Sequence, residues 1–127
     1  MSIKAYRPTT PAQRQKTTQD FDQITTRKPM KSLLASKKQQ AGRNNKGRIT
    51  VRHRGGGVKR HYRIVTYSLP VDMTFTIMEI EYDPNRSARI ARVKDQNNVY
   101  YYVIADNNMR KGETFTTGKD AGIENSN

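Results

Sequence analysis

Hydrophobic residues gather in the second half of the chain, where runs rich in β-branched and aromatic residues alternate with polar positions. Turn-forming residues separate the runs, as in the Asp-Pro-Asn-Arg-Ser segment at 83–87. The pattern predicts strands over Arg60–Tyr67, Met73–Tyr82, Ala88–Lys94, Val99–Ile104 and Glu113–Thr117. Five strands joined by tight turns favour an all-β fold, a small antiparallel barrel that is closed or nearly closed.

The first half of the chain has no comparable pattern. Three prolines among the first 29 residues bar a continuous helix, and repeated Thr-Thr pairs favour extended backbone up to about Lys31. Residues 31–38 can form at most one or two helical turns. Arg48–Arg52 alternates as a short strand would. We therefore predict a long, extended arm over residues 1–57 and a barrel domain over residues 58–127.

Charge separates the same two parts. Residues 1–63 hold 17 Lys/Arg against 2 Asp/Glu, whereas residues 64–127 hold 7 against 9, and the net charge is +13. No acidic residue occurs between Gln23 and Pro70. A segment this cationic repels itself and has little apolar surface to bury, so we expect residues 1 to about 54 to become ordered on a partner rich in negative charge. A nucleic-acid backbone is the commonest such partner.

Length and composition exclude several other classes of protein. A chain of 127 residues that is 33% hydrophobic can build one small core, and only its second half has the residues for it. The absence of cysteine excludes disulfides and thiolate metal sites. No apolar run approaches the roughly 20 residues of a membrane span, and the N-terminus has no secretory signal core. We expect no cofactor, no bound metal and no membrane association.

The candidate nucleic-acid contacts lie mainly in a short stretch before the first strong strand. Arginine forks can bind phosphates or stack on bases, lysine acts as a point charge, and histidine can stack on an unpaired base. Glycine lets the backbone approach a sugar-phosphate chain and donate its N–H groups. The candidates are Arg43, Asn44, Lys46, Arg48, Arg52, His53, Arg54, Gly55, Gly56, Gly57, Lys59, Arg60 and Arg63.

A second group of candidates, Arg86 and Arg89, lies beside the turn at 83–87 in the net-acidic half. General cationic attraction does not explain their position there. Asp83 can cap the turn or brace the fork of Arg86 for a phosphate. Alternation with Ile90 predicts that Arg89 projects outward from the strand. The opposing interpretation is an ordinary hairpin turn.

Two other functions can be weighed against RNA binding through the arm. An enzyme is disfavoured, because both histidines, His53 and His61, lie in a cationic loop with no carboxylate nearby in sequence to orient them. A free-standing barrel that binds single-stranded nucleic acid is the stronger rival. Such proteins expose stacking aromatic residues, which Tyr100, Tyr101 and Tyr102 can supply. The alternative is that these tyrosines pack the core and face a neighbour, and we favour it.

Three separated segments resemble the hallmark sequences of one family, ribosomal protein two of the large subunit. They are Gly42–Thr50, Arg52–Arg60 and Glu81–Ala88, and the opening Tyr6–Pro11 and the later Tyr102–Ala105 are also similar. The resemblance covers nearly the whole chain. It implies a ribonucleoprotein component that binds large-subunit rRNA directly, with a basic arm and a five-stranded oligonucleotide-binding-type barrel. It also implies neighbouring ribosomal proteins as partners and a place in the ribosome of bacterial cytoplasm or of an organelle such as the mitochondrion.

The sequence departs from the family pattern in length. Members of this family continue into a second barrel and a basic tail, whereas this sequence ends at Asn127. The resemblance therefore implies either a protein split between two polypeptides or a fragment, and a separate polypeptide carrying the C-terminal half is an expected partner. Val58 also replaces the more common histidine, and residues 95–98 replace the usual glycine turn. Neither change alters the spacing of the basic residues.

Overall fold

The computed structural model describes residues 3–39 and 41–118. Residues 119–127 of the expected barrel domain, like Met1 and Ser2 of the arm, lie outside this range. The described chain is all-β, as predicted, with one 3₁₀ turn, η1 (Lys31–Leu33), and no α-helix. The strands are β1 (Ile3–Ala5), β2 (Thr17–Gln19), β3 (Leu34–Ser36), β4 (His61–Arg63), β5 (Met73–Glu81), β6 (Ile90–Lys94), β7 (Tyr100–Ile104) and β8 (Thr114–Thr117). None of the helical structure in the described residues could cross a membrane.

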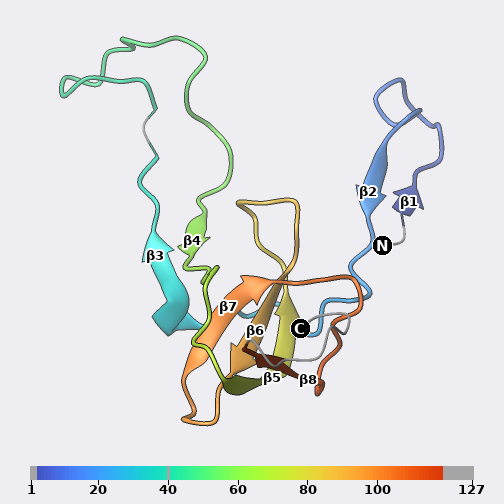
Figure 1. The fold of residues 1–127 in the computed structure, drawn as a ribbon. Helices are drawn as coiled ribbons and strands as arrows, with labels where there is room; N and C mark the ends of the chain where they lie inside the picture. The colour runs from blue at the N-terminus through green and yellow to red at the C-terminus, as the bar shows by residue number, and fades with distance from the viewer. Residues whose placement is uncertain (1–2, 40, 119–127) are drawn as a thin grey trace.

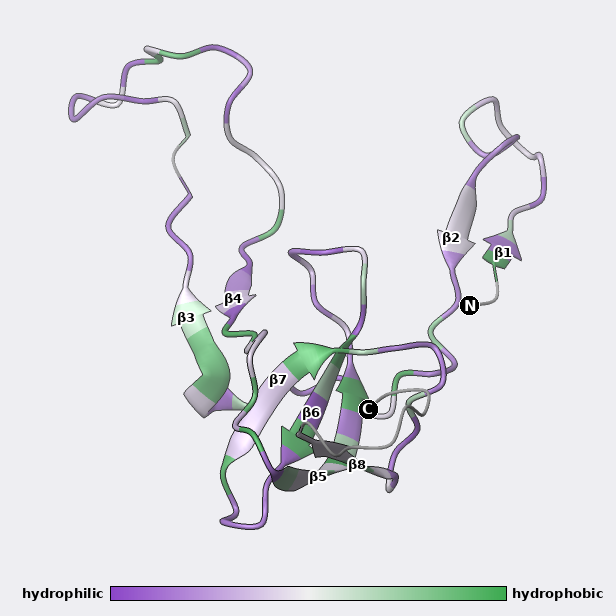
Figure 2. Ribbon diagram, viewed as in Figure 1, coloured by the Kyte–Doolittle hydropathy of each residue, from purple (hydrophilic) through white to green (hydrophobic). Residues whose placement is uncertain are grey.

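The core lies on a four-stranded antiparallel sheet with the order β7-β6-β5-β8. Alternate residues of these strands turn the same way and bury their side chains together, as period-two patterning requires. Phe75 of β5 is paired with Phe115 of β8, and their stacked rings are 5.5 Å apart. In Figure 2 the strands of the sheet carry both hydrophobic and hydrophilic residues, while the two arms are mostly hydrophilic. The buried cluster is Phe75, Ile77, Ala91, Val93, Val103 and Phe115.

The sheet is not closed into the expected five-stranded barrel. The first predicted strand forms as β4, but its partner is β3, with Leu34 opposite Arg63 and Ser36 opposite His61. Beyond β4 the chain touches the sheet through a bridge between Val65 and Tyr102. Each of the five predicted strands of the second half forms, but the first is shorter than expected, His61–Arg63 instead of Arg60–Tyr67. The pattern could not reveal β3, because residues 31–38 carry only a weak helical or extended preference.

Residues 20–30 contact the four-stranded sheet at several points. Thr25 donates its backbone N–H to the carbonyl of Ile80 at 3.0 Å, and Thr26 forms a parallel bridge with Glu81. The backbone N–H of Met30 donates to the hydroxyl of Tyr102 at 2.8 Å. These polar contacts to β5 and β7 hold a segment whose low apolar content gave no sign of it.

Two arms rise from the sheet in Figure 1. One is the hairpin of β1 and β2, where Lys4 pairs with Thr18. The other is the segment between β3 and β4, residues 37–60, which we name the basic loop. The strand predicted at Arg48–Arg52 does not form there: Ile49 makes one isolated bridge to Arg43, and Val51 begins a turn. Both apolar side chains are exposed, so no sheet face exists to bury them.

Candidate nucleic-acid interface

Asn44 organises the outer end of the basic loop. Its side-chain oxygen accepts the backbone N–H groups of Lys46 and Arg48, each at 3.0 Å. Its own backbone N–H donates to the carbonyl of Arg48, and its carbonyl accepts the N–H of Gly47, again at 3.0 Å. An asparagine side chain that replaces backbone partners in this way fixes a turn without any hydrophobic support. Asn44 therefore has a structural role, in addition to any contact with RNA.

Two glycines let the loop fold tightly on itself. Gly42 has φ of 65°, and a Cβ there would lie 2.3 Å from the carbonyl oxygen of Val51. A Cβ at Gly55 would lie 3.1 Å from Cα of Ala41. Gly56 and Gly57 also have positive φ, but a Cβ on either would meet open space. The glycines thus divide into two that allow a close crossing of the chain and two that leave the backbone accessible.

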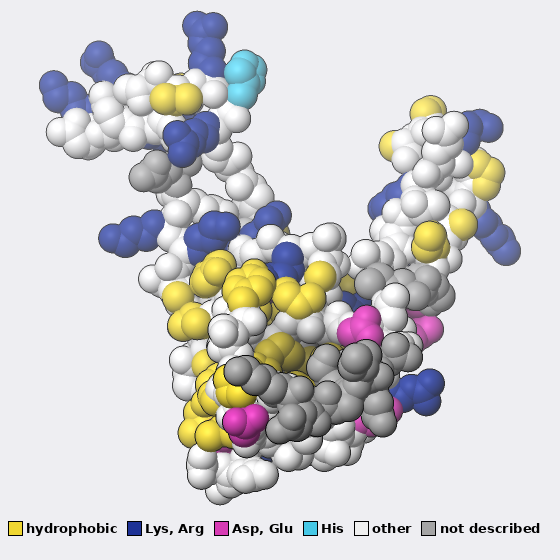
Figure 3. Space-filling model, viewed as in Figure 1, with side chains coloured by type: hydrophobic (Ala, Val, Ile, Leu, Met, Phe, Trp, Pro, Cys, Tyr) yellow, Lys and Arg dark blue, Asp and Glu magenta, His cyan; other side chains and the backbone are white. Residues whose placement is uncertain are grey.

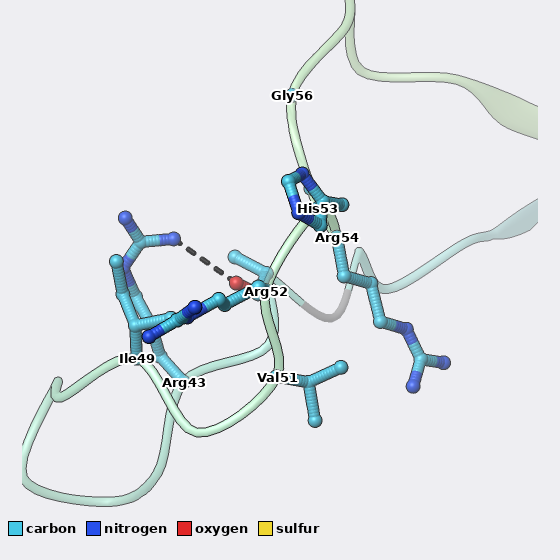
Figure 4. Close-up of a pocket in the computed structure, with 9 residues that line it drawn as sticks. Arg43, Ile49, Val51, Arg52, His53, Arg54 and Gly56 are labelled. Carbon is cyan, nitrogen blue, oxygen red and sulfur yellow. Dashed lines mark hydrogen bonds between the residues drawn. The ribbon is translucent and has the colours of Figure 1, made fainter.

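The crossing surrounds a hollow of about 560 Å³. Figure 4 shows Arg43, Arg52 and His53 around it, with Arg54 extending in another direction. Arg43 donates to the carbonyl of Ala41 at 3.0 Å, so its guanidinium is partly oriented by the backbone. Figure 3 shows the Lys and Arg side chains spread along both arms, whereas Asp and Glu lie over the sheet. The exposed basic candidates of the loop are Arg43, Lys46, Arg48, Arg52, Arg54, Lys59 and Arg60.

The turn at 83–87 holds one arginine firmly. Asp83 is fully buried, and its Oδ1 accepts the backbone N–H of Asn85 at 2.9 Å while its Oδ2 accepts Nε of Arg86 at 2.6 Å. Nη1 of Arg86 also donates to the hydroxyl of Tyr67 at 3.2 Å. Asp83 therefore both caps the turn and braces Arg86, as the sequence predicted. An arginine side chain fixed at Nε presents its remaining donors in a defined direction.

Asn85 joins this turn to the stem of the basic loop. Its side-chain nitrogen donates to the carbonyl of His61 at 2.8 Å, and its side-chain oxygen accepts Nζ of Lys37 at 3.4 Å. Nη1 of Arg63 donates to the same His61 carbonyl at 2.8 Å. The loop and the turn, 23 residues or more apart in sequence, are thus connected at one point. Sequence reasoning missed Asn85, because an asparagine in a turn is usually explained by the turn alone.

Two predicted contacts are buried. Arg89 is 5% exposed, and its guanidinium donates to Oε1 of Gln23 at 3.1 Å and to the carbonyl of Asp20. The expectation that Arg89 projects outward is therefore wrong: it pins the segment at residues 20–23 to the sheet. Arg63 is 9% exposed, and its Nε is buried without a hydrogen-bond partner among the described residues. The alternation that placed Arg89 took no account of a chain segment covering that face.

A buried polar cluster joins strands β5, β6 and β7 to the segment before η1. Tyr102 is fully buried and donates its hydroxyl hydrogen to Oε2 of Glu81 at 2.7 Å. Nη1 of Arg92 lies 3.3 Å from Oε1 of Glu81, close enough for an ion pair but without hydrogen-bond geometry. Burial raises the pKa of Glu81, and burial together with the bond to Glu81 raises the pKa of Tyr102 to about 12. The cluster thus favours a neutral Tyr102 that accepts the N–H of Met30.

The three consecutive tyrosines do not form an exposed stacking surface. Tyr102 is buried, and Tyr101 packs edge-on against Phe75 with ring centroids 5.9 Å apart. Tyr100 is half-buried and has Nζ of Lys94 5.9 Å from its ring centroid. The interpretation in which these rings pack the core and face a neighbour fits this arrangement, and the single-strand binder loses its main support.

The described residues contain no cluster of three or more His, Asp or Glu that could hold a metal ion. The family profile described as Ribosomal Proteins L2, RNA binding N-terminal domain matches residues 30–117 of this chain. The match includes β3 to β8, the basic loop and the turn at 83–87.

Proposed function

Because this chain belongs to the ribosomal protein L2 family, a structural family of the large ribosomal subunit whose N-terminal domain binds RNA, we propose that it holds large-subunit rRNA with two connected surfaces. The first is the basic loop, including Gly55, Gly56 and Gly57. The second is Arg86, fixed by its turn. In this proposal the arm, residues 1–57, supplies most of the contacts, and residues 58–127 form the domain that positions them.

The observation that carries the proposal is the connection through Asn85. Its bonds to His61 and Lys37 place a rigid guanidinium beside the stem of a loop dense in cations. Phosphates along one RNA strand can therefore meet the loop and Arg86 together. The loop neutralises phosphates with little demand on geometry, while the turn selects a strand that passes at the right distance.

The family's barrel remains part of the proposal. The chain after β4 runs beside β7, where Val65 bridges Tyr102 and the N–H of Thr66 donates to the carbonyl of Tyr102 at 2.8 Å. This contact lies on the edge of the sheet that a fifth strand would occupy. We propose that residues 60–67 serve as this strand of an oligonucleotide-binding-type barrel.

Salt dependence of RNA binding tests the role of the basic loop. Arg43, Arg48 and Arg52 are replaced together by Ala, and binding to a large-subunit rRNA transcript is measured by filter binding across salt concentrations. The slope of log affinity against log salt should flatten by about two to three units, because each lost phosphate contact removes roughly 0.7–0.9.

The matched control removes the same charge elsewhere. Lys4, Arg7 and Arg14, all exposed in the hairpin of β1 and β2 or its turn, are replaced together by Ala. This variant should flatten the slope by less than one unit if the loop provides the main contacts. Equal flattening in both variants would show that bulk charge alone attracts the RNA, and the proposed loop surface would then be wrong.

A further inference from the structure

A second cavity, of about 440 Å³, lies on the body of the protein away from the loop tip. Its lining comes from three separate parts of the chain: the segment before β3, strand β4 and the residue that follows β5. We name it the aromatic cavity, and it is lined by Phe21, Ile24, Arg27, Arg63 and Tyr82. Its size falls within the range of roughly 300–1,000 Å³ that holds small ligands. Phe21, Arg27 and Tyr82 were not among the residues predicted to bind RNA.

Two aromatic rings of the cavity remain open to solvent. Phe21 is 54% exposed and Tyr82 is 49% exposed. The rings meet edge to face, with centroids 5.6 Å apart and planes at 88°. In this arrangement the two rings contact each other, but part of their aromatic surface still faces the cavity. A contiguous exposed apolar surface rimmed by polar residues is typical of an interaction site.

Both rings stand on backbone that the structure fixes. Arg89 binds Asp20 and Gln23 on either side of Phe21, and the N–H of Ile24 donates to the carbonyl of Phe21 at 3.0 Å. Tyr82 lies between buried Glu81 and buried Asp83. The buried Arg89 therefore helps to form the aromatic cavity, because its bonds to Asp20 and Gln23 hold Phe21 beside Tyr82. Rings held in advance lose little conformational freedom when a ligand binds.

The cationic part of the lining points to an acceptor-bearing ligand. Arg27 is exposed, and among the residues that the structure describes no carboxylate lines the cavity. The Nε of Arg63 is buried and has no hydrogen-bond partner among the described residues. A buried N–H without a partner is rare in folded proteins, and a bound acceptor is one usual explanation. Aromatic surface and two guanidinium groups in one hollow match a nucleotide, which has a π face and phosphate oxygens.

We propose that the aromatic cavity receives one unpaired nucleotide of the rRNA. Its base stacks on Tyr82 or Phe21, and its phosphate or a base acceptor faces Arg27 and Arg63. This inference rests on the proposed function, since it adds a site for a single base to a surface otherwise built for the RNA backbone. A base inside a duplex cannot enter, so the site selects a bulged or looped strand. A peptide side chain is the competing occupant, but two arginines without an acid favour the nucleotide.

The experiment uses the full chain, which contains no Trp. Tyr82→Trp therefore introduces a single tryptophan, in the cavity, whose fluorescence can be excited apart from that of the tyrosines. Tyr100→Trp is the control, because Tyr100 pairs with Lys94 at the end of the sheet opposite to the Glu81–Ile90 pair. A large-subunit rRNA transcript should quench the fluorescence of the Tyr82→Trp variant by base stacking and leave that of the Tyr100→Trp variant unchanged. Phe21→Leu with Tyr82→Leu should weaken binding about tenfold to a hundredfold with an unchanged salt slope, because no charge is removed.

The possible failures are distinguishable. If the parent chain does not bind the transcript, the proposed function fails. If the parent binds while the fluorescence of the Tyr82→Trp variant is not quenched, and the double Leu variant binds as tightly, the cavity proposal alone is overturned. Quenching by assembled large subunits but not by the naked transcript would assign the cavity to a neighbouring protein and would also overturn it. The fluorescence measurement stands even if the double variant does not fold.

Discussion

The basic loop and the turn at 83–87 both present arginine, but they hold it in opposite ways. In the loop the backbone is fixed, through Asn44 and Gly42, while the charged side chains are exposed. In the turn the side chain itself is fixed, because buried Asp83 binds Nε of Arg86. The loop offers many charges with adjustable positions, and the turn offers one charge with a set position.

This difference teaches how a small protein can combine affinity with selectivity. Adjustable cations find phosphates wherever the RNA places them, which raises affinity for any RNA. A guanidinium held in a fixed position binds well only to an RNA whose phosphate lies within its hydrogen-bonding reach. Each of the following changes tests one side of the comparison.

The largest expected effect is on the turn. Asp83→Ala leaves Arg86, whose side chain is 17% exposed, and the N–H of Asn85 without their partner. We expect the free energy of unfolding, measured by urea denaturation, to fall by about 3 kcal/mol, because a largely buried ion pair is broken on one side. Asp106→Ala, at an exposed turn residue, is the control and should change it by less than about 0.5 kcal/mol. A loss below about 1 kcal/mol for Asp83→Ala would show that the turn is not held in this way.

Alkaline pH should weaken the buried cluster around Tyr102, which holds Met30 in the segment before β3, and leave the turn at 83–87 intact. The pKa of Tyr102 is raised to about 12 in the fold, compared with about 10 in an unfolded chain. The neutral phenol is therefore favoured by folding, and its contribution is fully present below pH 10 and is lost as the pH rises from 10 through 12. The loss is at most about 2.7 kcal/mol. Arg86 stays charged throughout, so its pair with Asp83 persists.

Urea denaturation between pH 9 and pH 12 measures this loss. Tyr102→Phe is the matched variant, since it removes the titrating hydroxyl and keeps the ring. Its stability should depend less steeply on pH than that of the parent. If the free energy of unfolding falls equally steeply with pH in both proteins, the ionisation of Tyr102 does not cause the loss of stability.

Replacing arginine by lysine compares the two regions directly. Arg86→Lys keeps the charge and removes the fork, and we expect about a tenfold loss of affinity for the rRNA transcript, or ~1.4 kcal/mol. Arg48→Lys, in the adjustable loop, should cost less than about threefold. Filter binding at a single moderate salt concentration measures both. Equal losses in the two variants would remove the distinction between a fixed and an adjustable arginine.

The smallest effects separate the glycines of the loop. Gly56→Ala meets no atom within 4 Å and carries only the strain of φ at 85°, about 1 kcal/mol. It should therefore weaken RNA binding by less than about fivefold. Gly42→Ala would bring Cβ to 2.3 Å from the Val51 carbonyl oxygen, so the crossing must open and the loss should be greater. If Gly56→Ala is the more damaging change, the added methyl group must clash with the RNA. The open glycines would then matter for binding more than the tight crossing of the chain does.

Much of the fold could be predicted from local pattern. The run over Met73–Tyr82 consists almost entirely of strand-forming residues and became β5, and the residues of the turn at 83–87 specify their own geometry through Asp83. The pairing of β3 with β4 was missed, because three-residue strands carry almost no period-two signal. Barrel closure was expected from strand number, and strand number does not determine which edges meet.

The candidate site was predictable where charge alone defines it. The exposed cations of the loop follow from their density and from the lack of acidic residues. Arg89 was misplaced, because burial by Asp20 and Gln23 depends on a contact 66 residues or more away in sequence. Phe21 and Tyr82 gave no signal for the same reason: their proximity is created by the fold. Pattern predicts what a residue is suited to do, but it does not predict what covers it.

The stem of the basic loop has a mechanical consequence. The β3–β4 ladder contains three residue pairs, so a short stem carries the 24 residues of the loop, 37–60. Because the loop is long, a small change in the direction of this stem would shift the tip of the loop by a much larger distance. Asn85 donates a hydrogen bond to the carbonyl of His61 and so restrains the stem at its base. The direction in which the loop leaves the sheet is therefore set beside Arg86, so a strand that meets the loop passes close to the fixed guanidinium.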